Sequence, residues 1–247
     1  PDHRVGFKDA VISDVKEYQT PLGAIPIHPD ANTLRQRSER LGVSEASDKS
    51  EHSLEVILPF LQTYLGKFEL IPVVVGFGNS SQLAEDLMPV VDDETLMVVS
   101  SDLSHYLPYE QASRKDRQTI DLILSMDMDE LVAQAENAAC GLRPILTLLH
   151  IAEKRNWQPY FLDYSNSGDT AGDKDRVVGY TAIAFLGDST MEESTNSSEG
   201  FSQEQGQNLV KLARQTIMAR FGMEIDTKDK KELEVFLADP DFQKKKG

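Results

Sequence analysis

The sequence predicts an α/β fold, and it does so through three short runs rich in β-branched residues with helical patterns between them. The runs are LIPVVVGF at 70–77, TLMVVSS at 95–101 and VVGYTAIAFL at 177–186. The first two are continuously apolar, which is typical of strands covered on both faces. Strands that alternate with helices predict an α/β sheet with some parallel pairs.

The remaining elements follow from local patterns. The run at 177–186 alternates less, which favours a place nearer the edge of the sheet. Apolar residues spaced by three and four predict helices around 54–65, 120–124 and 146–152. Asp48 stands three residues before Glu51, a possible capping box for the first of these helices, and Pro59 either kinks that helix or marks its first turn.

Composition limits the classes of function. The 247 residues carry 41 acidic and 25 basic side chains, a formal net charge of −16, which repels phosphate backbones and anionic lipid surfaces. Nucleic acid is therefore an unfavourable partner. No apolar stretch approaches the roughly 20 residues that span a bilayer, so we expect no membrane segment. A single cysteine, Cys140, cannot form an internal disulfide, which fits a cytoplasmic location.

The chain divides at a change in composition. Residues 1–187 hold the strand and helix patterns, and 188–201, rich in serine, threonine and acids, are predicted to be a linker. Residues 202–247 open with an amphipathic helix and are too few for a core, which indicates the start of a truncated second domain. The first residues, beginning at Pro1, suggest that an upstream portion precedes them.

The stretch VVSSDLSHYLPY at 98–109 is the first candidate site. It follows a predicted strand, and open α/β sheets place their ligands at the carboxyl ends of strands. Asp102 could fix the tautomer of His105 and make it a general base. Two alternatives stay open: Asp102 simply caps the turn, or Ser101 is a nucleophile, although no G-x-S-x-G motif surrounds it.

His52, in KSEHSLEVILPF, is the second candidate. We expect it in the first turn of its helix, where the positive end of the helix dipole favours anions and lowers an imidazole's pKa. The alternative is a surface or capping histidine, which is the commoner case.

Cys140, in AACGLRPI, is the third candidate. The pattern places it at a helix end, with Gly141 as the stop and Pro144 just inside the next helix. A thiol exposed at such a break could bind a metal or act as a nucleophile. The alternative is a buried cysteine that packs as a small apolar residue.

Several segments together resemble one family. They are PDHR, KEYQTPLGAIPI, EHSLEVILPFLQ, IPVVVG, VVSSDLSHYLPY, ACGLRPI and YSNSGDTAGDKDRVVGYTAIAF. In order and over nearly all of residues 1–187 they resemble the MEMO family, AmmeMemoRadiSam system protein B. FSQEQGQNLVKLARQTI, after the linker, resembles the opening helix of an AmmeMemoRadiSam system protein A domain, whose α+β fold would here be truncated.

The resemblance implies a fold similar to class III extradiol dioxygenases, with a sheet flanked by helices. It implies that His3 and Cys140 are metal ligands for iron or copper, with a further histidine upstream of residue 1. It aligns His105 with the acid–base histidine of the dioxygenases and places Asp102 and His52 in the same pocket. The cysteine replaces the carboxylate ligand of the dioxygenases and is a softer donor, so ring cleavage does not follow directly.

These residues and the resemblance lead to two main hypotheses about function. The first is a metal-dependent redox enzyme, an oxidoreductase with His105 as its base. The second is a non-catalytic module that binds a peptide or small-molecule ligand in the same pocket and works with a radical-SAM partner protein. A serine or cysteine hydrolase is a third, less favoured hypothesis.

Overall fold

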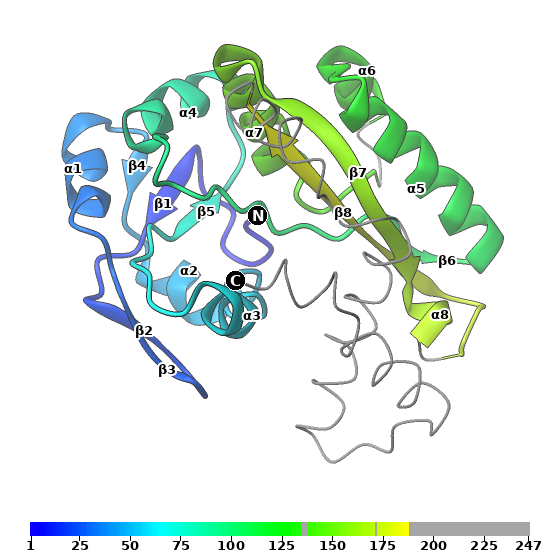
Figure 1. Cartoon of the computed structure of the whole chain (residues 1–247), viewed down its shortest axis with the longest axis horizontal. Coiled ribbons are helices and arrows are strands. Elements are labelled where there is room, and N and C mark those ends of the chain that lie inside the picture. The colour runs from blue at the N-terminus through cyan, green and yellow to red at the C-terminus, as the bar shows by residue number, and fades with distance from the viewer. Residues whose placement is uncertain (135–137, 171, 188–247) are drawn as a thin grey trace, which may run out of the picture. The chain divides into compact units, whose positions relative to one another are not determined.

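The structure is a computed structural model that describes residues 1–134, 138–170 and 172–187. Helices and strands form a mixed α/β arrangement in which two three-stranded sheets lie apart, each with its own helices (Figure 1). The predicted linker and second domain, 188–247, lie outside the described residues. No described helix combines the length and the apolar composition needed to cross a membrane.

The first sheet has the order β4-β1-β5. β1 (Ala10–Ile12) pairs in parallel with β4 (Leu41–Gly42) and antiparallel with β5 (Val73–Val75). The helices α1 (Asp30–Arg37) and α4 (Ser80–Leu87), the latter continued by the 3₁₀ helix η1 (Met88–Val90), contribute Leu34 and Leu83 to the core that this sheet covers. The apolar run at 70–77 thus contains a strand, as predicted.

The second sheet has the order β6-β8-β7, and both of its pairings are antiparallel. It consists of β6 (His105–Leu107), β7 (Gln158–Asn166) and β8 (Val177–Leu186), and α8 (Ser167–Thr170) follows β7. β8 matches the predicted run, but the predicted place near an edge is wrong, because β8 lies between the other two strands. Only the β1–β4 pair is parallel among the described strands, fewer than the α/β pattern suggested.

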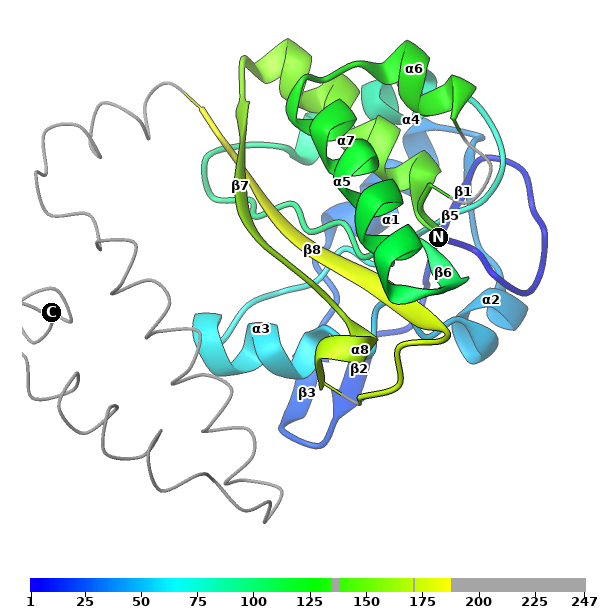
Figure 2. The same ribbon diagram turned by 90° about the vertical axis from the view of Figure 1, so that its right-hand side faces the viewer.

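Three helices lie beside this second sheet (Figure 2). They are α5 (Tyr109–Leu124), α6 (Met128–Ala133) and α7 (Leu142–Arg155). α5 contacts both β7 and β8, and α7 packs against α4. Ile151 of α7 belongs to the core of the first sheet, whereas Leu146 and Leu149 belong to the core of the second. α7 therefore joins the two halves of the molecule.

The run at 95–101 is not a strand of either sheet among the described residues, contrary to the prediction. Its side chains alternate: Leu96 and Val98 are exposed, whereas Met97 packs against the first core and Val99 against the second. The segment bridges the two cores as an extended chain. The segment is apolar because the side chains on one of its sides contact both cores. It is not a strand with both faces covered, as its composition had suggested.

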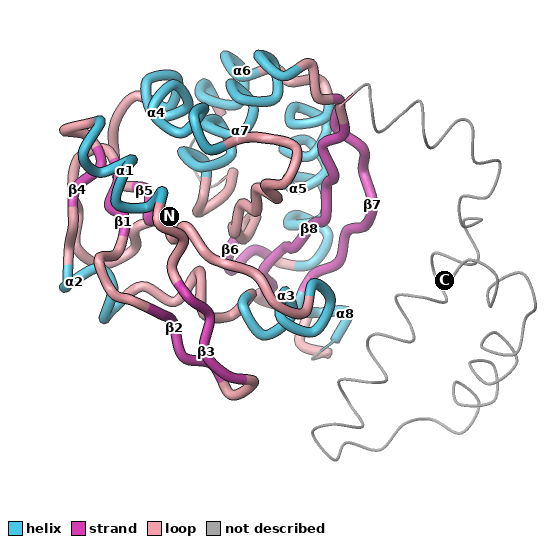
Figure 3. The backbone as a smooth tube through the Cα atoms, turned by 60° about the vertical axis from the view of Figure 1, so that its left-hand side comes forward, coloured by secondary structure: helices cyan, strands magenta, loops and turns pink. Residues whose placement is uncertain are grey.

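The region of His52 also differs from the prediction. A helix begins earlier, at α2 (Glu45–Ser50), where the Ser44 side chain accepts a hydrogen bond from the Ser47 backbone and caps the helix. The next helix, α3 (Leu58–Leu65), carries Pro59 in its first turn, the second of the two predicted roles. His52 thus lies between two helices. The β2–β3 hairpin (Glu17–Thr20 and Gly23–Pro26) extends beside α3 (Figure 3).

Candidate active site

The first part of the site is a pair formed by His3 and Glu51. The segment that carries His3 is attached to the first sheet, since the Asp2 backbone donates to the Val75 carbonyl over 2.8 Å. The His3 backbone N–H donates to Glu51 Oε2 over 2.9 Å, and His3 Nδ1 lies 3.0 Å from Glu51 Oε1. The Glu51 side chain is only 3% exposed, so this carboxylate is almost fully removed from water.

Four hydrogen-bond contacts surround the Glu51 carboxylate. Besides the two from His3, the backbone N–H groups of His52 and Ser53 each donate to Oε1 over 3.0 Å. Burial alone would raise the pKa of Glu51, but the hydrogen bonds from His3 and Ser53 outweigh it and lower the pKa to about 2. The carboxylate is therefore ionised at neutral pH and accepts from Nδ1–H of His3, which leaves the lone pair of that ring on Nε2.

Sequence reasoning did not single out Glu51 as a site residue. The local pattern presented it as a helix-capping acid, whereas its main partner, His3, is 48 residues away. The one clue in the sequence to a role for Glu51 was its position directly before the candidate histidine His52. A carboxylate that orients a histidine is a common partner of metal-binding imidazoles.

The second part of the site surrounds Cys140. Its sulfur accepts the Asp102 backbone N–H over 3.1 Å and lies 3.6 Å from the Ser101 hydroxyl. The Cys140 N–H donates in turn to the Asp102 carbonyl over 3.1 Å. The thiol is partly exposed and hydrogen-bonded, which differs from the alternative of a buried apolar cysteine.

Gly141 has a different role from the predicted helix stop. The preceding helix, α6, ends at Ala133, and Gly141 is instead the N-cap residue of α7. Its N–H donates to Ser101 Oγ over 2.8 Å, and a Cβ added to it would lie 2.6 Å from the Ser101 Cβ. A glycine is needed here because the two segments approach so closely. Pro144 lies in the first turn of α7, as predicted.

The third part of the site is the pair of Asp102 and His105. Asp102 Oδ2 lies 3.4 Å from His105 Nε2, although the chain does not turn helically between them, and both side chains are partly exposed. This separation exceeds the roughly 2.7–2.9 Å of a strong charge-assisted hydrogen bond, so the pair is an electrostatic contact. The Ser101 hydroxyl donates to the Asp102 carbonyl. That bond gives the serine hydrolase hypothesis no support.

His105 opens the short strand β6, in which the backbone is irregular. Tyr106 has a φ of 60°, in the left-handed region, and the register with β8 shifts between His105 and Leu107. The Arg176 guanidinium lies 4.8 Å from the centre of the Tyr106 ring, a cation–π contact on a side chain that remains exposed.

These parts approach one another through two residues. Asp102 bonds Cys140 through its backbone and contacts His105 through its carboxylate. The Pro1 nitrogen lies within electrostatic reach of both Glu51 and Cys140, which brings the first two parts of the site near each other. In the part of the chain that the structure describes, however, no three His, Cys, Asp or Glu side chains are grouped closely enough to hold a metal ion.

His52 is not placed as predicted. It follows α2 instead of opening a helix, so the argument from the helix dipole does not apply. Its ring is 61% exposed, and Nδ1 lies 2.7 Å from Glu55 Oε1 at the surface. The backbone of His52 nevertheless belongs to the site, because its N–H donates to Glu51.

A cavity of about 610 Å³ opens elsewhere, between α5 and α6, and is lined by residues such as Gln111, Arg114 and Gln118. None of the predicted site residues lines it. The hydrogen-bonded groups around His3, Cys140 and His105 are the stronger candidate for a functional site, because such sites bring several reactive side chains together and this cavity does not. Arg143, in the first turn of α7 near Cys140 in sequence, donates to the Gly78 carbonyl.

Comparison with known proteins supports one family. The family model of Memo-like protein matches residues 1–184. A MEMO1 family protein of Sulfurisphaera tokodaii is 38% identical over 181 residues, 68% of this chain and 64% of that protein. One of Sulfolobus acidocaldarius is 35% identical over 180 residues, 68% of this chain and 63% of that protein. One of Thermoplasma acidophilum is 35% identical over 194 residues, with 75% and 72% covered. The chain thus spans less than two thirds of the first two relatives.

Proposed function

Since the chain belongs to the Memo-like protein family, we propose that it is a metal-dependent redox enzyme in which His3 and Cys140 bind iron or copper. The observation that carries this proposal is the buried, ionised Glu51 carboxylate bonded to His3 Nδ1. Burying a carboxylate is unfavourable unless it is well paired, and here its effect is to orient one imidazole.

His3 has the form that a metal ligand requires. With Nδ1–H donated to Glu51, the lone pair on Nε2 is available, and the His3 ring is 43% exposed. Carboxylate–histidine pairs of this kind fix the ring and increase the basicity of the donor nitrogen.

Cys140 offers a complementary donor. Its sulfur accepts the Asp102 N–H, which fixes the position of the sulfur, and a cysteine binds metals through its sulfur as the thiolate. Imidazole and thiolate together suit copper, zinc and iron. These two donors fit such a metal in kind, and the resemblance to the family implies a further histidine upstream of Pro1 as the third. A bound metal would supply Lewis acidity and redox chemistry.

His105 would act as the proton-transfer group. The Asp102 carboxylate near Nε2 favours the tautomer with its proton on that nitrogen, which leaves Nδ1 as a base. Because the pair is partly exposed, His105 can exchange a proton with solvent after each turnover.

Metal titration under anaerobic conditions tests the proposal. Thiolate sites select Cu(I), so Cu(I) competed against a chromogenic chelator is the first probe, followed by Fe(II). We expect Cys140→Ser and His3→Ala to weaken metal binding most, since each removes one of the two donors, and Glu51→Gln to weaken it about 10- to 100-fold. His28→Ala is the matched control, because His28 lies in a separate turn beside Asp30 and Glu69. Equal affinity in all five proteins, wild type included, would refute the metal site.

A ligand-binding module is the second candidate, and one observation favours it. The described residues do not group three donors around one point, whereas Asp102 and His105 form a partly exposed polar pair suited to a peptide or small molecule. A radical-SAM protein of the same system would then be the partner that the resemblance implies. A protein that stays metal-free in the titration, yet shifts its His105 ring resonances with added peptide, would support this candidate.

A further inference from the structure

We infer that Asp116 is a positioning residue that fixes the segment of residues 102–105, and with it both Cys140 and His105. The importance of this segment rests on the proposed function, but the evidence for Asp116 is separate. Asp116 lies on α5 and is fully buried, with 0% exposure. Its carboxylate accepts the Ser104 backbone N–H over 2.8 Å, and Ser104 directly precedes His105.

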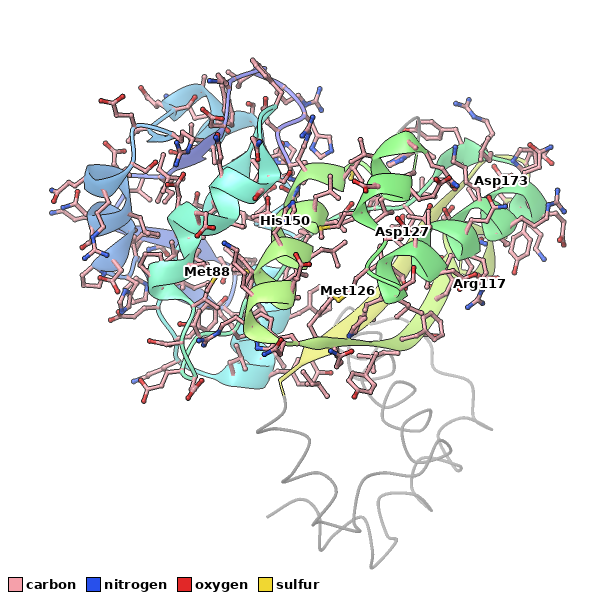
Figure 4. The ribbon with its side chains drawn as sticks, turned by 90° about the horizontal axis from the view of Figure 1, so that it is seen from above. Met88, Arg117, Met126, Asp127, His150 and Asp173 are labelled. Carbon is pink, nitrogen blue, oxygen red and sulfur yellow. The ribbon has the colours of Figure 1, made fainter. Side chains whose placement is uncertain are left out.

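The other oxygen of Asp116 is also occupied. Oδ2 accepts the Tyr164 hydroxyl over 2.9 Å. The Tyr164 ring is contacted in turn by Arg117 (Figure 4), whose guanidinium carbon lies 5.8 Å from the ring centre. A carboxylate without water needs such donors, so the buried Asp116 carboxylate holds β7 and the 102–105 segment together.

β8 completes the junction through Gly179. The Leu103 N–H donates to the Gly179 carbonyl over 2.9 Å, and the Gly179 N–H donates to the Ser104 carbonyl over 3.0 Å. A Cβ added at Gly179 would lie 1.9 Å from Asp116 Oδ2, so only glycine leaves room for the carboxylate. Helix, strand and segment therefore meet at Asp116.

The consequence reaches both reactive groups. Asp102, two residues before Ser104, bonds Cys140 through its backbone N–H and carbonyl. His105, one residue after Ser104, contacts the Asp102 carboxylate. Asp116 touches neither group directly and acts through the backbone between them.

Amide hydrogen exchange of the metal-free 247-residue chain tests this inference. In Asp116→Ala we expect exchange at Leu103, Ser104 and Gly179 to accelerate about tenfold beyond any change at Ile12, the size expected for one lost hydrogen bond. In Asp116→Asn the amide oxygen still accepts from Ser104, so exchange should return to within about threefold of wild type. The His105 ring resonances should shift in the first variant and recover in the second.

Two further variants keep the test decisive. Gly179→Ala should displace the carboxylate and reproduce the local acceleration even if Asp116→Ala does not fold. Tyr164→Phe removes only the bond to Oδ2 and should leave the Ser104 amide nearly unchanged. Equal acceleration at Ile12 and Ser104, or no recovery in Asp116→Asn, would overturn the inference. Because no metal is present, these results stand apart from the metal titration.

Discussion

The two histidine–carboxylate pairs of the site are built in opposite ways. In one, Glu51 is 3% exposed and holds His3 with two contacts of 2.9 and 3.0 Å. In the other, Asp102 is 46% exposed and stands 3.4 Å from His105. The first carboxylate is buried and closely hydrogen-bonded, whereas the second is exposed and only in electrostatic contact with its histidine.

This difference in burial and distance indicates the role to which each pair is suited. A ligand must hold one orientation, and the buried carboxylate provides that for His3. A proton carrier must exchange with solvent and change its charge at little cost, which an exposed pair permits. Under the proposed function, the same two residue types would therefore serve two roles because their surroundings differ.

The largest expected effect is that of Glu51→Ala. It leaves the N–H groups of His3, His52 and Ser53 without their acceptor, so we expect a loss of about 3 kcal/mol in the free energy of unfolding. Urea denaturation at pH 7 measures it. A loss below about 1 kcal/mol would contradict the view that this pair is fixed by its surroundings.

Acid should remove part of the same contribution. The pKa of Glu51 is about 2 in the folded chain against an ordinary 4.5. A depressed pKa means that the ionised group stabilises the fold above pH 4.5, and that this contribution is lost as the pH falls from 4.5 toward 2. Glu51→Gln should lack this component, so its midpoint of thermal unfolding should change less over that interval than the wild-type midpoint. Parallel curves would contradict the assignment.

Ser101→Ala should have an intermediate effect. It removes the acceptor of the Gly141 N–H at the start of α7, and we expect a loss of about 1 kcal/mol. Urea denaturation gives the value, and Ser81→Ala on α4 is a surface control. An unchanged midpoint would show that water replaces the serine hydroxyl there.

The smallest expected effect is that of Asp102→Asn. Exposed ion pairs contribute little, so the stability should change by less than about 0.5 kcal/mol. The His105 ring resonances should nevertheless shift in this variant, which NMR can follow, because a neutral amide replaces the carboxylate that contacts Nε2. A stability loss comparable to that of Glu51→Ala would remove the contrast between the pairs.

The sequence predicted most where the information is local. The run at 177–186 became β8 over its full length, since β-branched residues favour a strand wherever its partners lie. The run at 95–101 is also rich in β-branched residues but pairs with no strand among the described residues. Its alternate side chains, Met97 and Val99, pack against two different cores, and no local pattern in the sequence reveals those cores.

The sequence predicted most of the residues of the candidate site but fewer of the contacts between them. Asp102 and His105 contact each other because they are close in sequence. Glu51 was missed as a partner of His3, since a contact across 48 residues leaves no local periodicity. His52 was misplaced because the apolar pattern alone does not fix where a helix begins. The Ser44 cap starts α2 before His52, and Pro59 lies in the first turn of α3 after it.

One consequence concerns Tyr106, whose φ of 60° lies inside β6. An L residue rarely adopts this left-handed conformation, so the backbone next to His105 tolerates few residue types at position 106. Valine or isoleucine there would strain the backbone of β6, whereas glycine or asparagine would accept the same φ.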